Sequence, residues 1–343
     1  MTEGRVRDGT PASPSRPLEV DSLLGPRGLW RLLLGLALGL LLLALAARGI
    51  DRQEIRSGIQ RADPVGVVLA LLTVLLTTAA KVIRWRRLFP GSRSPRYSPL
   101  ARALLVGQLV NALLPARLGD VARAYTLGRD EGLSKATVLG TVATEKVFDV
   151  LFLLLAAALT ALFGSLPAWL HGSLAGLVAL GATVLIAARF LPQRRILALA
   201  QRLARRLPGA LPTRTIDLLE RGLTGLEGLR RPRIAAAAGL WSAIIWTLAA
   251  GTNLVLFWAF DLPLSLGAAL LLLTLLHVGM TPPSSPVRLG VFHAITVFAL
   301  GAVGVGRPFG LAYATVLHAL VYGPQILLGA LALGLPLAPR EAP

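Results

Sequence analysis

The amino-acid sequence predicts an all-α, polytopic integral membrane protein built from two inverted-topology repeats with broken or re-entrant helices. Hydrophobic residues make up 55% of its 343 residues and charged residues only 15%, with a mean hydropathy of +0.68. This composition excludes an ordinary soluble domain. Apolar stretches approach or exceed the roughly 20 residues that one bilayer crossing needs. In addition, two short strings occur twice, once in each half of the chain.

The repeated strings combine helix breakers with an arginine. Pro115–Gly119 reads Pro-Ala-Arg-Leu-Gly and returns at Pro286–Gly290 as Pro-Val-Arg-Leu-Gly, while the Ala-Thr-Val-Leu of Ala136–Leu139 returns at Ala314–Leu317. Arginine at membrane depth is costly and usually functional. Its presence twice, beside interrupted helices, is typical of a transport site between two repeats. The alternative is coincidence, since these residue types are abundant in the chain.

Segments with little or no charge predict the spans. The segments around residues 100–115 and 262–286 both end at the repeated string, so they predict broken helices. Membranes tolerate a broken helix only where protein or a wet cavity surrounds it. The spans are residues 32–47, 64–83, 147–170, 172–188, 234–260, 262–287, 289–306 and 308–339.

Arginine-rich loops set the expected orientation, because such loops stay in the cytoplasm. Residues 84–102 and 189–233 are the strongest of these loops, and they place residues 48–63 outside although that loop also carries arginines. The parity then makes residues 100–145 a re-entrant hairpin from inside and residues 262–306 one from outside. An alternative treats each hairpin arm as a full crossing. We expect both termini to be cytoplasmic in a multi-pass cell-membrane protein.

The chain is expected to divide into four parts. Residues 1–28 are polar and predict a disordered cytoplasmic tail. Residues 29–191 form the first transmembrane repeat and residues 233–338 the second. Between them, residues 192–232 predict two basic amphipathic helices on the inner leaflet. They act either as a sensor of anionic lipids or simply as a positively charged connector.

One polar cluster in the first repeat is a candidate binding site. Spacing by three or four residues places its members on common helix faces. Its arginines could bind an anion, since guanidinium binds phosphate in a bidentate manner. Alternatively, the cluster is a structural ion network in which Asp120 compensates buried guanidinium charge. The cluster comprises Arg117, Asp120, Arg123, Glu145, Lys146 and Asp149.

In the second repeat, Arg288 has no acid near it in the sequence, so it is the better candidate for an anionic ligand. His277 and His293 are its polar neighbours. The chain has no cysteine, and its four histidines have no metal-ligand spacing. No nucleotide-binding or catalytic motif is found. We therefore expect no metal, no cofactor and no enzymatic activity. We attribute the positive net charge of +18 to cytoplasmic loops that face anionic lipid headgroups, rather than to binding of nucleic acid.

Three motifs resemble the lysylphosphatidylglycerol synthase transmembrane region family. They are residues 107–120 (Gly-Gln-Leu-Val-Asn-Ala-Leu-Leu-Pro-Ala-Arg-Leu-Gly-Asp) followed by Arg123, residues 134–151 with Ala-Thr-Glu-Lys-Val-Phe-Asp, and residues 282–292. The resemblance covers roughly residues 30–335. It implies a flippase-like membrane domain, here as a stand-alone member without the soluble domain that makes aminoacyl lipids. Some stand-alone members are linked to glycolipid or polyprenyl-lipid pathways. Lys146 replaces a common arginine, and His293 stands near where a glutamate is common. The second departure argues against a carboxylate-dependent step in the second half and implies an altered headgroup preference.

Together these features predict a protein that translocates or binds an anionic or zwitterionic phospholipid, glycolipid or polyprenyl-phosphate lipid in a midplane cavity. Its partners would be membrane lipids, and its oligomeric state stays open. The first alternative is a membrane subunit or partner of a separately encoded lipid-modifying transferase, and the second is a non-catalytic scaffold. The expected substrate-binding residues are Arg117, Arg288, Arg123, Asp120, Glu145, Asp149 and His293.

Cysteine labelling tests the orientation, since the chain has no native cysteine to interfere. We expect a cysteine introduced at Thr126 to react with a membrane-impermeant reagent from the cytoplasmic side. A cysteine at Val305 should react only from outside. Labelling of both positions from the same side would contradict the inverted arrangement.

Overall fold

The computed structural model describes residues 26–89, 94–114, 118–163, 168–190, 232–281 and 285–334, and the regular structure in these ranges is helical throughout. Three helices are long and apolar enough to cross a membrane by length and composition, namely α4, α11 and α14. The all-α, polytopic prediction is thereby confirmed. The long helices are α2 (Pro26–Ala47), α4 (Pro64–Arg87), α7 (Lys135–Phe163), α8 (Ala168–Phe190), α11 (Pro232–Ala259) and α14 (Arg307–Gly334).

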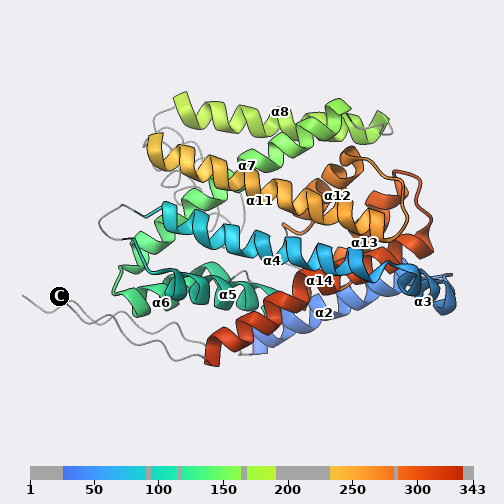
Figure 1. Cartoon of the computed structure of the whole chain (residues 1–343), viewed down its shortest axis with the longest axis horizontal. Coiled ribbons are helices and arrows are strands. Elements are labelled where there is room, and N and C mark those ends of the chain that lie inside the picture. Colours follow the sequence, from blue (N-terminus) through green and yellow to red (C-terminus); the bar gives the residue numbers. More distant parts are fainter. Residues whose placement is uncertain are drawn as a thin grey trace, which may run out of the picture.

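The long helices run side by side between two ends of the bundle (Figure 1). We call these the Arg87 end, where α4 finishes, and the Asp63 end, where it begins. α2, α7 and α11 run from the Arg87 end towards the Asp63 end, and α4, α8 and α14 run back (Figure 1). At the Asp63 end, the short helix α3 (Arg52–Arg61) packs against α14, with Gly58 beside Ala312.

Two hairpins of short helices enter the bundle from opposite ends. α5 (Tyr97–Leu113) and α6 (Gly119–Glu131) begin and finish at the Arg87 end, whereas α12 (Leu266–Gly279) and α13 (Val291–Gly301) begin and finish at the Asp63 end (Figure 1). A single-turn helix, η2 (Pro286–Arg288), joins the arms of the second hairpin and contacts α5. Each arm is shorter than a crossing requires. The geometry is that of re-entrant hairpins rather than of full crossings, and the duplication itself stays a prediction.

Several predicted boundaries differ from the observed helices. The span predicted at 147–170 begins twelve residues too late, because α7 already starts at Lys135. The first hairpin consequently ends at Glu131 and not near residue 145. Residues 84–87, assigned to a cytoplasmic loop, are the last turn of α4. Predictions for residues 1–25, 191–231 and 335–343 lie outside the described residues.

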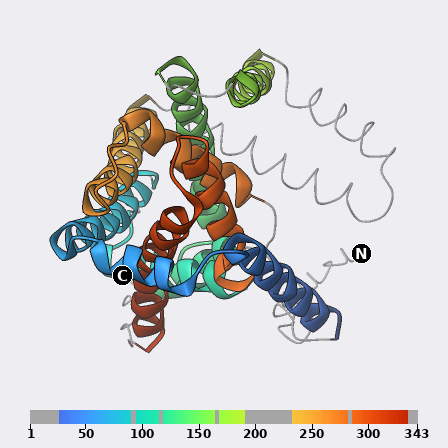
Figure 2. The ribbon, with the colours of Figure 1, turned by 90° about the vertical axis from the view of Figure 1, so that its right-hand side faces the viewer.

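α2 and α8 lie at the periphery of the bundle (Figure 2). α8 packs on α7, and α2 packs on η2, α13 and α14. Exposed leucines such as Leu34 on α2 and Leu180 on α8 suit a lipid-facing surface. In lipid there is no hydrophobic drive to bury such residues, so helix association depends on close packing and on polar contacts between helices.

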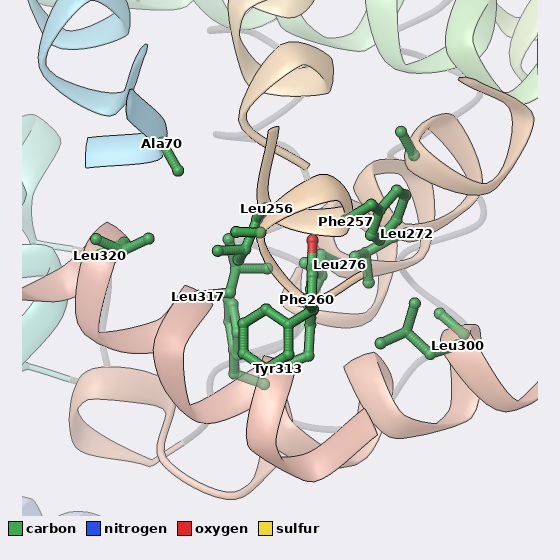
Figure 3. Packing of buried hydrophobic residues seen from close by; sticks show 14 of the residues in the cluster. Ala70, Leu256, Phe257, Phe260, Leu272, Leu276, Leu300, Tyr313, Leu317 and Leu320 are labelled. Carbon is green, nitrogen blue, oxygen red and sulfur yellow. The ribbon is translucent and has the colours of Figure 1, made fainter. Parts of the chain in front are cut away.

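The most extensive helix–helix contact, between α4 and α11, combines close packing with a polar contact. Gly66 lies against Ala259, and the hydroxyls of Thr73 and Thr252 hydrogen-bond across the pair at 2.8 Å. A buried aromatic and leucine cluster then ties α11 to α12, α13 and α14 (Figure 3). In it, the Tyr313 hydroxyl donates to Asn253 Oδ1 at 3.0 Å. The scaffold around the hairpins is thus held by contacts that a lipid solvent does not weaken.

The arms of the first hairpin approach each other closely at two glycines. A Cβ added to Gly107 on α5 would collide with the Arg123 side chain and the Gly119 carbonyl, and one added to Gly119 would meet Gly107 and Asn111. Asn111 Oδ1 also accepts from the Gly119 backbone N–H at 2.8 Å. These contacts fix the position of α6, and therefore of Arg123.

We expect Gly107→Ala to destabilise the protein by roughly 1–3 kcal/mol, the usual cost of overpacking. The matched control is Gly176→Ala on the lipid-facing surface of α8, where a Cβ meets no atom within 4 Å. This control should be neutral or slightly stabilising because alanine favours helix. The measurement is the thermal unfolding midpoint in detergent. Equal midpoints for the two variants would contradict the close approach.

Candidate functional site

A polar cavity lies inside the bundle where the two hairpins meet. Its volume is about 350 Å³, within the range of about 300–1,000 Å³ common for small-molecule sites. Both hairpins and the helices α4, α7, α11 and α14 line it, whereas the described side chains of α2, α3 and α8 do not. Of the predicted site residues that lie in the described ranges, all except His293 line this cavity. The charged lining residues are Lys81, Asp120, Arg123, Glu145, Lys146, Asp149 and Arg288.

Glu145 on α7 is the centre of a buried ion network. One of its carboxylate oxygens accepts from Arg84 Nη2 at 2.9 Å, and the other accepts from Arg123 Nη2 at 2.8 Å. Arg84 also donates to Asp149 at 2.7 Å and to Ser242 at 2.9 Å. The side chains of Arg84, Arg123 and Glu145 are at most 5% exposed. One carboxylate therefore joins α4, α6 and α7, and Ser242 adds α11.

A tryptophan completes the burial of Arg123. The guanidinium carbon lies 3.9 Å from the ring centroid of Trp85, a cation–π contact. The Trp85 indole N–H donates to the Thr141 hydroxyl at 2.9 Å. Charges at membrane depth need such partners, because an unpaired charge there is costly. The arrangement favours the structural interpretation of this part of the cluster.

Asp120 takes no part in the described hydrogen bonds around Glu145. Among the described residues its ion-pair partner is Lys146 Nζ at 3.9 Å, and the side chains of Asp120 and Lys146 are 30% and 54% exposed. The buried guanidinium charge of this network is compensated by Glu145 and Asp149 instead. Because Arg117 lies outside the described residues, the prediction that Asp120 compensates buried guanidinium charge stays a prediction. The sequence did not show the pairing of Arg84 with α7, because it places Arg84 in a loop.

Arg288 lies at the tip of the second hairpin in a strained backbone. Both Val287 and Arg288 have positive φ values, 53° and 54°. This conformation costs roughly 1–2 kcal/mol for each residue that is not glycine. Such strain gathers at functional sites. The Arg288 guanidinium donates to the Met280 carbonyl at 3.0 Å, and among the described residues no carboxylate lies within 4 Å of it.

Lys81 is a cavity residue that the sequence analysis overlooked. It lies on α4, within a span predicted from its low charge. Asp149 is within electrostatic reach of it but is bonded to Arg84. In the described part of the chain, Lys81 forms no ion pair within 4 Å. The sequence could have indicated Lys81 by its spacing, because it follows Thr77 by four residues and Thr78 by three and so shares a helix face with both.

His293 lies away from the cavity. It is buried on α13 with its ring 4.9 Å from that of His318 on α14, and His318 Nε2 lies 2.9 Å from the Val287 carbonyl oxygen. His293 therefore packs behind the tip of the second hairpin.

Arg117 lies outside the described residues. Within the described ranges, no group of histidine and acidic side chains could hold a metal ion.

The chain belongs to the family described as the lysylphosphatidylglycerol synthase transmembrane region, whose model matches residues 32–329. The resemblance drawn from the three motifs is thereby confirmed. A membrane location follows from the family and from the apolar helices.

Two curated proteins are similar in sequence. The glycosyltransferase AglD of Haloferax volcanii is 33% identical over 119 residues, which are 34% of this chain and only 19% of that protein. A UPF0104 membrane protein of Methanothermobacter thermautotrophicus is 26% identical over 317 residues, covering 83% of this chain and 89% of that protein. No solved structure matches the chain.

We expect Glu145→Gln to destabilise the protein by roughly 3–5 kcal/mol, because it leaves two buried guanidinium groups with too little negative charge. Asp120→Asn is the matched control, since its ion pair is long and half-exposed, and such pairs contribute about 0–1 kcal/mol. The thermal unfolding midpoint in detergent measures both. A Glu145→Gln protein as stable as Asp120→Asn would contradict the network.

Proposed function

We propose that this protein binds the headgroup of a phosphate-bearing lipid in the central cavity, between Lys81 and Arg288, and moves it across the bilayer. The observation that carries the proposal is the pairing of charges. Each acid that lines the cavity already faces a basic group, whereas Lys81 and Arg288 form no ion pair among the described residues. Two cations without an ion pair in the lining of one cavity suit an anionic ligand.

The cavity would lower the barrier to headgroup movement. A charged headgroup entering hydrocarbon loses its hydration at a large cost in free energy. Lys81 and Arg288, with the threonine and amide groups of the wall, would replace that hydration while the tails stay in lipid. Because the hairpins enter from opposite ends, movement of one against the other would open the cavity to one leaflet at a time. The strained backbone at Val287 and Arg288 supports a tip that moves.

A second function is favoured by one finding. The matched relative AglD is described as a glycosyltransferase, so this chain could be the membrane partner of a lipid-modifying transferase. The alignment covers too little of that protein to carry its activity over. Turnover of a lipid donor by the purified protein would support the second function, and lipid movement without chemical change would support the first.

The test is transport in reconstituted vesicles with fluorescent lipids, without nucleotide. We expect wild-type protein to accelerate movement of phosphate-bearing lipids between leaflets. Lys81→Met and Arg288→Ala should each slow this movement about tenfold or more, since hydrogen bonds to charged groups contribute about 1.5–3 kcal/mol. Both variants should keep near wild-type melting temperatures, because neither residue pairs with a buried acid.

Arg129→Ala is the control, because it removes an arginine that is 63% exposed at the Arg87 end. It should transport like the wild type. Failure of the wild type to accelerate any phosphate-bearing lipid, with and without a proton or sodium gradient, would overturn the proposal in favour of the transferase partner or a scaffold.

A further inference from the structure

We infer that the headgroup held in this cavity is a phosphate ester of a neutral polyol, such as glycerol, inositol or a sugar, rather than a cationic aminoacyl headgroup. The inference rests on the proposed function, because it assumes that Lys81 and Arg288 bind the phosphate. It goes further by assigning the group attached to that phosphate. Its basis is the hydrogen-bonding capacity of the wall beside Lys81.

The hydroxyl oxygens of the two threonines that precede Lys81 can accept hydrogen bonds, but their hydrogens are already donated to the backbone. The Thr77 hydroxyl donates to the Thr73 carbonyl at 2.7 Å, and the Thr78 hydroxyl donates to the Val74 carbonyl at 3.1 Å. A hydroxyl has one hydrogen and two lone pairs, so both oxygens remain as acceptors. In the same lining, the buried carbonyl oxygen of Gln108 on α5 has no hydrogen-bond partner in the described residues.

The Gln108 oxygen is buried without a partner and the two threonine oxygens are half-buried with free lone pairs, so all three favour a ligand that donates hydrogen bonds. A buried acceptor without a partner costs about 1–3 kcal/mol, and a phosphate alone offers almost no donor. Thr77 and Thr78 precede Lys81 by four and three residues, so the three side chains share one face of α4. The substituent of a phosphate bound to Lys81 can therefore lie one helical turn away, beside the two hydroxyl oxygens. Hydroxyl or ammonium groups on that substituent would complete the hydrogen bonds.

The charges on the cavity wall select neutral hydroxyls over ammonium groups. Among the described residues, Glu145 and Asp149 are bonded to arginines, and Asp120 faces Lys146. A cationic headgroup would thus meet no carboxylate without a basic neighbour, and it would stand close to Lys81 and Arg288. Like charges that lie close together repel, and this repulsion would exclude a cationic headgroup from the cavity. The headgroup inferred here differs from the lysyl group that the family description names.

The experiment is competition binding with the full-length protein in detergent, using a fluorescent phosphatidic acid as the reporter. The competitors are phosphatidylglycerol, phosphatidylinositol, a polyprenyl hexosyl phosphate, unlabelled phosphatidic acid, lysylphosphatidylglycerol and a neutral diglucosyl lipid. We expect at least one phosphate–polyol lipid to bind about tenfold more tightly than phosphatidic acid or lysylphosphatidylglycerol, as two added hydrogen bonds would produce. The competitors with different polyols distinguish glycerol, inositol and sugar.

The double variant Thr77→Val/Thr78→Val removes the acceptors while nearly keeping side-chain shape. It should lower affinity for the preferred polyol lipid about five- to tenfold and leave affinity for phosphatidic acid unchanged. Thr183→Val is the control, because Thr183 makes the same hydroxyl-to-carbonyl bond on α8, away from the cavity. It should change neither affinity.

The outcomes separate this inference from the proposed function. If phosphatidic acid or lysylphosphatidylglycerol binds as tightly as every polyol lipid and still depends on Lys81 and Arg288, the inference is wrong and the proposed function stands. An equal loss of all ligands in the double threonine variant also overturns the inference, since the effect is then structural. If no phosphate-bearing lipid binds, or the neutral glycolipid binds as tightly, both are overturned.

Discussion

The buried carboxylate of Glu145, shared by two arginines, is the interaction on which the rest of the structure depends. It joins Arg84 of α4 and Arg123 of α6 to α7 in the interior of a protein whose helices cannot rely on hydrophobic burial for association. The hairpin of α5 and α6 has arms too short to cross a bilayer. The Arg123–Glu145 bond holds this hairpin at depth, and the close approach of Gly107 and Gly119 sets its angle.

This network also determines which charges remain for a ligand. It pairs both oxygens of Glu145 and one oxygen of Asp149 with arginines, and Lys146 faces the remaining cavity acid, Asp120. Lys81 and Arg288 are left on the wall of the cavity, from two elements that lie far apart in sequence. Because neither belongs to the ion network around Glu145, they could bind a ligand without disturbing it. The same polar interior thus has a structural part and a part suited to binding.

Much of the fold could be predicted from the sequence, but the pairing of charges could not. The proline- and arginine-containing strings located the first hairpin turn and η2, and loop arginines gave the parity that makes the short helices re-entrant. Hydropathy alone could not show that α4 continues through Arg84, because an arginine at the edge of an apolar run resembles a loop residue until its partners on α7 are known. The sequence therefore placed Glu145 and Asp149 in the charged cluster but did not show their pairing with Arg84, and Lys81 was overlooked.

The most direct test is a cryo-electron microscopy map of the protein in native-lipid particles. The account predicts headgroup density in the cavity, with its strongest feature between Lys81 Nζ and the Arg288 guanidinium, and unchanged contacts around Glu145. Native mass spectrometry of the same sample would identify the lipid. Density for a phosphate bound to Arg84 or Arg123, with Glu145 displaced, would contradict the division into a structural network and a binding pair.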